Sequence, residues 1–352
     1  MKKLFSAYQL GKINLKNRIV MAPMTRSRAT VDHVPTDIMT KFYAQRASAG
    51  LLITEGTSPS PNGLGYPRIP GIFSLEQVSA WKKIADAVHV GGGKIFMQLM
   101  HTGRASHPAN MAKGTKILAP SAIGLQGQMW TDSEGMQNYP VPQEMTEAEI
   151  HTAIQEYADA AAKTIEAGLD GVELHSANGY LMDQFLNPAS NKRTDVWGKD
   201  RSKFALEVTK AVVQRIGAER VGIRLSPYGV FNDMVAYPEM EEFFLKLTKE
   251  LSALKLVYLH LVDHSAMGAP PVSADLKRKI RESFVGTLIL SGGYDAGRAE
   301  ADLQENKADL IAYGRPFISN PDLVEKLKSG EKLKDNDATT FYTPGEKGYL
   351  DY

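Results

Sequence analysis

Gly171-Val-Glu-Leu-His-Ser-Ala-Asn-Gly-Tyr180 is a short apolar run that passes directly into polar residues and glycine. Apolar runs of this length are typical of parallel strands that are buried on both faces. Seven more runs share the pattern, and they span residues 18–24, 51–56, 94–99, 221–225, 256–261, 287–290 and 310–313. The chain therefore carries eight candidates for buried parallel strands.

Helix signals fill the gaps between these runs. Ser74 with Gln77 and Thr146 with Glu149 have the spacing of capping boxes, and glycine follows both helical segments. Helices are predicted at residues 36–50, 74–91, 150–167, 201–216, 238–254, 296–306 and 321–328. The alternation predicts an α/β fold, a (β/α)8 TIM barrel that forms a single domain over residues 1–352. A doubly wound open sheet is the structural alternative.

One segment interrupts the alternation. Residues from about 101 to 145 are rich in Gly, Pro, Ser and Asn and show no clear helical period. A long irregular loop in a compact domain is usually functional or disordered. Because it follows the third strand, it would lie at the face where barrels carry their active sites. We predict a hairpin-like lid insertion here, with a merely decorative insertion as the alternative.

The composition limits the classes of function. The 352 residues include 41 basic and 40 acidic side chains, so the net charge of +1 gives no reason to expect a nucleic-acid partner. The absence of cysteine excludes disulfides, thiolate zinc sites and cysteine-ligated iron–sulfur clusters, and no metal site is expected. No apolar run approaches the roughly 20 residues of a membrane span. We expect a cytoplasmic monomer or homodimer without a membrane partner.

Glycines follow the last two predicted strands. Gly292 and Gly293 come after the seventh strand, and Gly314 and Arg315 come after the eighth. Glycine leaves backbone N–H groups approachable, arginine adds a permanent charge, and barrels often bind phosphate at this position. The pattern favours a phosphate site over the alternative of turn glycines beside a surface arginine.

The residues after the fourth strand could act on a substrate oxygen. His175 and Asn178 are three positions apart, so in helix-like backbone they would share one side. Both side chains can donate hydrogen bonds to one carbonyl or nitro oxygen, and Tyr180 could supply a proton. The alternative is a structural histidine followed by a simple Asn-Gly turn.

Taken together, these motifs resemble the Old Yellow Enzyme family of flavin-dependent ene-reductases over essentially the whole chain. The matching stretches are Asn17-Arg-Ile-Val-Met-Ala-Pro-Met-Thr-Arg26, Ile53-Thr-Glu-Gly-Thr57, Gln98-Leu-Met-His-Thr-Gly-Arg104, Gly171-Val-Glu-Leu-His-Ser-Ala-Asn-Gly-Tyr180, Leu181-Met-Asp-Gln-Phe-Leu-Asn-Pro188, Asn191-Lys-Arg-Thr-Asp195, Ser291-Gly-Gly293 and Tyr313-Gly-Arg-Pro-Phe317. The family fold implies a (β/α)8 barrel that holds non-covalent FMN at its C-terminal mouth.

The resemblance also implies roles for individual residues. The expected FMN contacts are Pro23, Met24 and Thr25 along the ring, Gly56 and Gln98 at its pyrimidine edge, Arg224 near N1 and O2, and Gly292, Gly293, Gly314 and Arg315 at the phosphate. The Thr25 hydroxyl would hydrogen-bond the flavin O4 and so tune the redox potential. Met100 replaces a tryptophan that many relatives carry, which implies a differently shaped substrate pocket. Tyr349 is expected to lie over that pocket.

The chemistry implied by the resemblance is a ping-pong reduction of activated alkenes. NADPH or NADH would deliver hydride to the flavin, and the alkene would receive it while His175 and Asn178 hold its oxygen and Tyr180 protonates its α-carbon. Expected substrates are enones, maleimides and nitroalkenes, with nitro compounds or nitrate esters as further candidates. Two alternatives stay open at this point: a flavin-free barrel lyase or isomerase acting on a phosphorylated substrate, and a non-catalytic flavin carrier.

Overall fold

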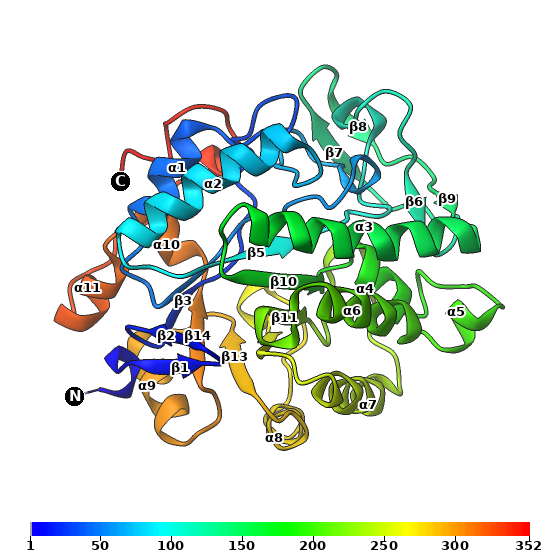
Figure 1. The fold of residues 1–352 in the computed structure, drawn as a ribbon. Helices are drawn as coiled ribbons and strands as arrows, with labels where there is room; N and C mark the ends of the chain where they lie inside the picture. The colour runs from blue at the N-terminus through cyan, green and yellow to red at the C-terminus, as the bar shows by residue number, and fades with distance from the viewer. Residues whose placement is uncertain (1) are drawn as a thin grey trace.

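Eight parallel strands form a closed barrel in the computed structural model, which describes residues 2–352 (Figure 1). The barrel strands are β3 (Ile19–Met21), β4 (Leu51–Ile53), β5 (Ile95–Leu99), β10 (Gly171–Ser176), β11 (Val221–Leu225), β12 (Tyr258–Val262), β13 (Thr287–Ser291) and β14 (Leu310–Tyr313). Each strand pairs with its neighbours in chain order, and β14 pairs with β3 to close the ring. The predicted barrel is confirmed, and the open-sheet alternative is wrong.

Helices surround the barrel largely where they were predicted. These helices are α1 (Asp37–Ala44), α2 (Leu75–Val90), α3 (Glu147–Glu166), α6 (Lys203–Ile216), α7 (Met240–Ala253), α9 (Ala296–Gln304) and α11 (Leu323–Ser329). Both capping boxes are formed, with Ser74 bonding the N–H of Gln77 and Thr146 bonding that of Glu149. The first helix ends at Ala44, well before the predicted stop at Gly50.

Four helices were not predicted from the sequence, namely α4 (Leu181–Leu186), α5 (Val196–Lys199), α8 (Ala274–Ser283) and α10 (Arg315–Ser319). Three of them are short. The remaining helix, α8, is strongly polar and buries only Leu276 and Ile280, so few apolar residues mark it in the sequence. Short 3-10 helices also occur at Lys3–Phe5, Pro61–Gly63, Pro108–Asn110, Ala218–Arg220, Phe231–Asp233, Ser265–Met267 and Ala338–Thr340.

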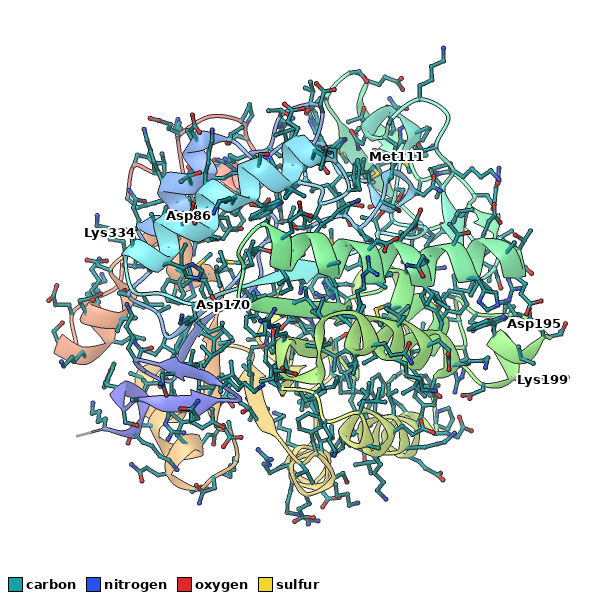
Figure 2. All side chains as sticks on the ribbon, viewed as in Figure 1. Asp86, Met111, Asp170, Asp195, Lys199 and Lys334 are labelled. Atoms are coloured by element: carbon teal, nitrogen blue, oxygen red, sulfur yellow. The ribbon has the colours of Figure 1, made fainter. Side chains whose placement is uncertain are left out.

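An N-terminal hairpin closes one end of the barrel. Strands β1 (Tyr8–Leu10) and β2 (Ile13–Leu15) pair antiparallel. Leu10 and Leu15 pack in one cluster with Val20, Leu51 and other inward residues of the barrel strands. Charged side chains such as those labelled at Asp86, Lys199 and Lys334 lie on the outside of the molecule (Figure 2). Because the hairpin closes the N-terminal end of the barrel, a ligand can enter at the opposite, C-terminal end.

The long segment after β5 contains two small sheets. Strands β7 (Gln128–Thr131) and β8 (Gly135–Asn138) form an antiparallel hairpin, while β6 (Leu118–Ala119) pairs with β9 (Gln143–Glu144). The hairpin lies beyond the end of the barrel strands (Figure 1), and residues of β7 line the cavity described below. A hairpin is thus present where one was predicted, and its action as a lid stays a prediction. Among residues 2–352, no helix combines the length and apolarity needed to cross a bilayer.

Candidate active site

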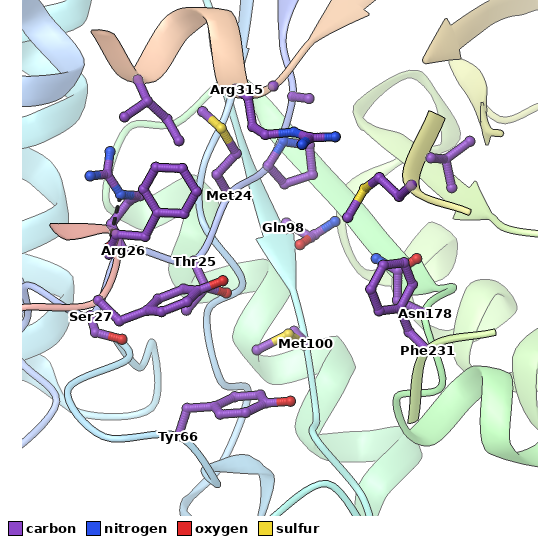
Figure 3. A pocket seen from close by; sticks show the side chains of 18 of the residues that line it. Met24, Thr25, Arg26, Ser27, Tyr66, Gln98, Met100, Asn178, Phe231 and Arg315 are labelled. Atoms are coloured by element: carbon purple, nitrogen blue, oxygen red, sulfur yellow. Dashed lines mark hydrogen bonds between the residues drawn. The ribbon is translucent and has the colours of Figure 1, made fainter. Parts of the chain in front are cut away.

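A cavity of about 1130 Å³ opens at the C-terminal ends of the barrel strands (Figure 3). Thirteen of the predicted site residues line it, and they are Pro23, Met24, Thr25, Gln98, Met100, His175, Asn178, Tyr180, Arg224, Gly292, Gly293, Gly314 and Arg315. Thr25 and Asn178 lie on opposite sides of the cavity, with Gln98 and Met100 between them (Figure 3). Residues that are distant in the sequence meet here because parallel strands end at one face.

Two predicted residues do not line the cavity. Gly56 is buried behind Met100, since a side chain at Gly56 would meet the Met100 sulfur. The expectation for Tyr349 is wrong, because this residue is fully buried and its ring stacks on Phe42 with centroids 4.2 Å apart. Tyr342, earlier in the same C-terminal segment, is the tyrosine that lines the cavity.

The turn after β10 fixes the position of Asn178. Asn178 has φ 61°, a left-handed conformation that asparagine tolerates better than most residues. Its N–H donates to Ser226 Oγ at 2.9 Å, and its carbonyl accepts from the Asn232 side chain at 2.8 Å. His264 Nε2 lies 2.6 Å from Asn178 Oδ1. Because Oδ1 can only accept, His264 donates this bond, and the amide N–H groups of Asn178 remain available to a ligand oxygen.

His175 and Tyr180 lie against each other in the cavity wall. Their rings meet edge to face with centroids 4.9 Å apart. Burial, reinforced by the nearby Arg224 cation, holds the pKa of His175 well below its usual value, so the imidazole is neutral at physiological pH. A neutral imidazole carries one N–H and can act as a hydrogen-bond donor without bringing a charge.

Tyr180 retains its phenolic proton. Its hydroxyl donates to the Tyr66 hydroxyl at 3.4 Å, and burial raises the pKa of Tyr180 to about 12. At physiological pH the Tyr180 side chain is therefore a protonated acid. It lies against His175, one of the two residues expected to donate a hydrogen bond to a substrate oxygen. Tyr66 and His264 were not predicted as site residues, because no local sequence pattern marks either of them as a ligand contact.

The polar groups of the cavity fit a flavin mononucleotide. At the floor, Arg224 Nε is buried without a hydrogen-bond partner among residues 2–352, and the same holds for His175 Nδ1. At the rim, the backbone N–H groups of Gly293 and Gly314 make no bond within the described chain, and the Arg315 side chain is exposed beside them. The Arg224 cation at the floor matches the pyrimidine edge of a flavin ring. The free N–H groups and the Arg315 cation at the rim match its phosphate. Among the residues that the structure describes, no group of side chains is arranged to hold a metal ion.

Asp183 supports the turn that carries Asn178 and Tyr180. It is buried and accepts the Gly179 N–H at 2.8 Å. Burial raises the pKa of Asp183 to about 7, above the ordinary value of 3.8, so the folded protein holds a proton that the unfolded chain releases. Its contribution to stability is therefore complete below about pH 4 and lost as the pH rises through about 7.

We expect Asp183→Asn to reduce this pH dependence, because the amide can still accept the Gly179 N–H but cannot titrate. The measurement is urea unfolding of the wild type and the variant at pH 5 and at pH 7.5. The wild type should lose more free energy of unfolding between the two pH values than the variant does. Equal losses would show that Asp183 does not titrate in this range. Burial also raises the pKa of Glu55 to about 7. Glu55 therefore contributes the remaining pH dependence of the free energy of unfolding in both proteins.

Comparison with known proteins agrees with this geometry. Residues 3–334 match the NADH:flavin oxidoreductase / NADH oxidase family. The chain is 40% identical over 372 residues to 12-oxophytodienoate reductase 7 of Oryza sativa subsp. japonica, covering 99% of this chain and 94% of that protein. It is 40% identical over 350 residues to a probable flavin mononucleotide-dependent alkene reductase of Leishmania infantum, covering 97% and 95%.

Solved structures give the same result. Morphinone reductase superposes with a TM-score of 0.95 at 40% identity, covering 100% of this chain and 96% of that one. The old yellow enzyme homologue from Zymomonas mobilis superposes with a TM-score of 0.95 at 40% identity, covering 99% of both chains. The chain thus belongs to the Old Yellow Enzyme family, as an FMN-dependent oxidoreductase that uses a nicotinamide hydride donor.

Proposed function

We propose that the protein reduces activated carbon–carbon double bonds, in enones, maleimides and nitroalkenes, with NADPH or NADH as the source of hydride. The observation that carries this proposal is the convergence of His175, Asn178 and Tyr180 on one cavity that also holds the FMN-facing residues. The name of the Leishmania infantum relative, an alkene reductase, supports the same substrate class.

His175 and Asn178 would hold the substrate's carbonyl or nitro oxygen. The Asn178 amide is oriented by the 2.6 Å bond from His264, and the neutral His175 ring contributes an N–H. Negative charge grows on this oxygen as the β-carbon receives hydride, so donors fixed in advance favour the transition state over the bound substrate. A substrate without such an oxygen would gain nothing from this pair.

Tyr180 would protonate the α-carbon. Its pKa of about 12 keeps the proton on the phenol until the α-carbon becomes basic, and its ring contact with His175 supports this role. After transfer, the Tyr180 phenolate would regain its proton from solvent. The added hydride and proton together account for the two hydrogens of the saturated product.

When bound, FMN would supply the redox chemistry of this site, which is hydride transfer between a nicotinamide and the alkene. Pro23, Met24 and Thr25 would lie along its ring, Gln98 and Arg224 at its pyrimidine edge, and Gly293, Gly314 and Arg315 at its phosphate. The flavin-free lyase or isomerase is not favoured. The chain belongs to a flavin oxidoreductase family, and no lysine of residues 2–352 lines the cavity to form a Schiff base.

His175→Ala should weaken the binding of simple phenols by about tenfold, because one donated hydrogen bond to a phenolate oxygen is worth about 1.4 kcal/mol. Phenolates imitate the charged oxygen of the reaction and bind without reacting. The measurement is a titration of the flavin absorbance of the oxidised holoenzyme with a para-substituted phenol. His89→Ala, at a half-buried histidine outside the cavity, serves as the matched control. Equal phenol affinity in His175→Ala and wild type would contradict the assigned role.

The direct test of the activity uses two half-reactions. NADH or NADPH is added to the holoenzyme without oxygen until the flavin absorbance is bleached, and 2-cyclohexenone is then mixed in. We expect the absorbance to return at a rate that depends on the enone concentration, together with cyclohexanone as product. A rate equal to that of buffer alone, for an enone, a maleimide and a nitroalkene in turn, would contradict the proposal.

A further inference from the structure

A chain of buried polar side chains lies beneath the cavity floor. Glu173, on β10, is fully buried inside the barrel. Its Oε1 accepts from Gln98 Nε2 of β5 at 2.8 Å, while its Oε2 accepts from the Tyr258 hydroxyl of β12 at 3.1 Å. The same Oε2 lies 2.8 Å from His260 Nδ1, also of β12. Glu173 therefore joins three barrel strands, although it does not line the cavity itself.

The network fixes which atom of each neighbour is the donor. Burial favours the neutral acid, but His260, Arg224 and the Gln98 amide together hold the pKa of Glu173 below its usual value, so the side chain is a carboxylate. A carboxylate only accepts hydrogen bonds, so His260 Nδ1 carries a hydrogen and Gln98 directs its amide nitrogen at Glu173. Burial also keeps His260 neutral by lowering its pKa, so its Nε2 accepts from the Ser291 hydroxyl at 2.9 Å.

The directions of these hydrogen bonds determine which atoms of Gln98 and Ser291 face the cavity. Gln98 and Ser291 both line it. With its nitrogen bound to Glu173, Gln98 has its carbonyl oxygen free, and Ser291, whose hydrogen points to His260, has free lone pairs. The floor therefore offers acceptors on either side of Arg224, and hydrogen-bond acceptors are what the N3–H of a flavin ring requires.

Glu173 also balances the charge of Arg224. Arg224 is on β11, between β10 and β12, and registers with His175 and His260. Arg224 is buried, which lowers the pKa of its guanidinium, and the negative charge of Glu173 acts against this shift. In a low-dielectric interior this carboxylate reduces the positive potential that Arg224 presents to a ligand.

We propose that Glu173 is a positioning residue for FMN: it orients Gln98 and Ser291 as acceptors and limits how strongly Arg224 stabilises the reduced cofactor. The inference rests on FMN occupying this cavity and does not depend on which alkene is reduced. It is therefore separable from the proposed function, because its readouts involve no substrate.

Glu173→Gln is the first test. The amide keeps the size of the side chain but removes its charge and adds a donor, so one neighbour must turn and Gln98 presents its nitrogen to the cavity. We expect the FMN dissociation constant to rise at least about tenfold, because a matched hydrogen bond is replaced by a mismatched one. We also expect the midpoint potential of the bound flavin to rise, because Arg224 is no longer balanced and the reduced flavin is anionic.

Asp170→Asn is the matched control. Asp170 lies at the opposite end of β10, where its carboxylate bonds His89 at 2.8 Å and the Ile95 N–H at 2.9 Å (Figure 2). This variant should lower the thermal midpoint of the holoenzyme without moving the flavin potential or the FMN dissociation constant. A dye-coupled redox titration of each holoenzyme and a fluorescence titration of released FMN give the two values.

Tyr258→Phe provides a second test that leaves the cavity wall intact. It removes one donor from Glu173, so the carboxylate acts more strongly on Arg224 and the flavin potential should fall, opposite in sign to Glu173→Gln. Unchanged potential and FMN affinity in Glu173→Gln would overturn the proposal, as would equal shifts in Asp170→Asn. If Glu173→Gln does not fold, an unchanged potential in Tyr258→Phe overturns it instead.

Discussion

Tyr180→Phe should slow the reoxidation of the reduced enzyme by 2-cyclohexenone by about 10²- to 10⁴-fold, the usual contribution of a positioned general acid. The substitution removes only the hydroxyl and keeps the ring that packs edge to face on His175. Oxygen binding by His175 and Asn178 is therefore preserved, while the proton for the α-carbon has to come from water. Stopped-flow absorbance of the flavin measures the rate.

The reduction of the flavin by NADH serves as the internal control, because hydride transfer to the flavin needs no proton from Tyr180. Its rate should stay within about threefold of wild type. Tyr66→Phe is the matched variant, since its hydroxyl bonds that of Tyr180 at 3.4 Å, and its effect on reoxidation should be much smaller. Equal losses in the two half-reactions of Tyr180→Phe would contradict the assignment of Tyr180 as proton donor.

Arg28→Ala should destabilise the protein by at least about 3 kcal/mol and loosen one wall of the cavity. Arg28 is only 2% exposed, and its guanidinium donates to four carbonyl oxygens of the C-terminal segment. The acceptors are Thr340, Phe341, Gly345 and Lys347, with distances from 2.6 to 3.3 Å. Burial lowers the pKa of Arg28 to about 10, so it remains a cation at neutral pH.

The segment that Arg28 holds contributes Phe341, Tyr342, Thr343 and Pro344 to the cavity. The loss should therefore appear both in urea unfolding and as faster cleavage near the C-terminus in limited proteolysis. Arg278→Ala is the control, because Arg278 is an exposed arginine of α8 with two surface ion pairs, which contribute little. Similar unfolding midpoints for Arg28→Ala and Arg278→Ala would contradict this account of the C-terminal segment.

The sequence was sufficient for the barrel because its strands are short, almost wholly apolar and regularly spaced. It was also sufficient for the residues at strand ends, such as His175, Gln98 and Arg224, since all parallel strands end at one face. It did not predict α8, whose polar composition hides its two buried residues.

Contacts between distant segments could not be predicted either. The C-terminal segment folds back over the barrel through Arg28, a contact that no local pattern encodes. The family resemblance assigned Tyr349 to the cavity, whereas Tyr342 lines it. Glu173 lies within a short apolar run and has no sequence signal of its own. Its role depends on partners from β5 and β12 that become neighbours only when the barrel closes.

Hydride from the bound flavin and a proton from the protein are expected to enter opposite carbons of an activated double bond. The most direct measurement is the position of deuterium in the product of 2-methylcyclohexenone reduction. Hydride-labelled NADD in ordinary water should place deuterium at the β-carbon alone, and unlabelled NADH in D₂O should place it at the α-carbon. Label at the carbonyl carbon, or product without label in the first experiment, would contradict the account.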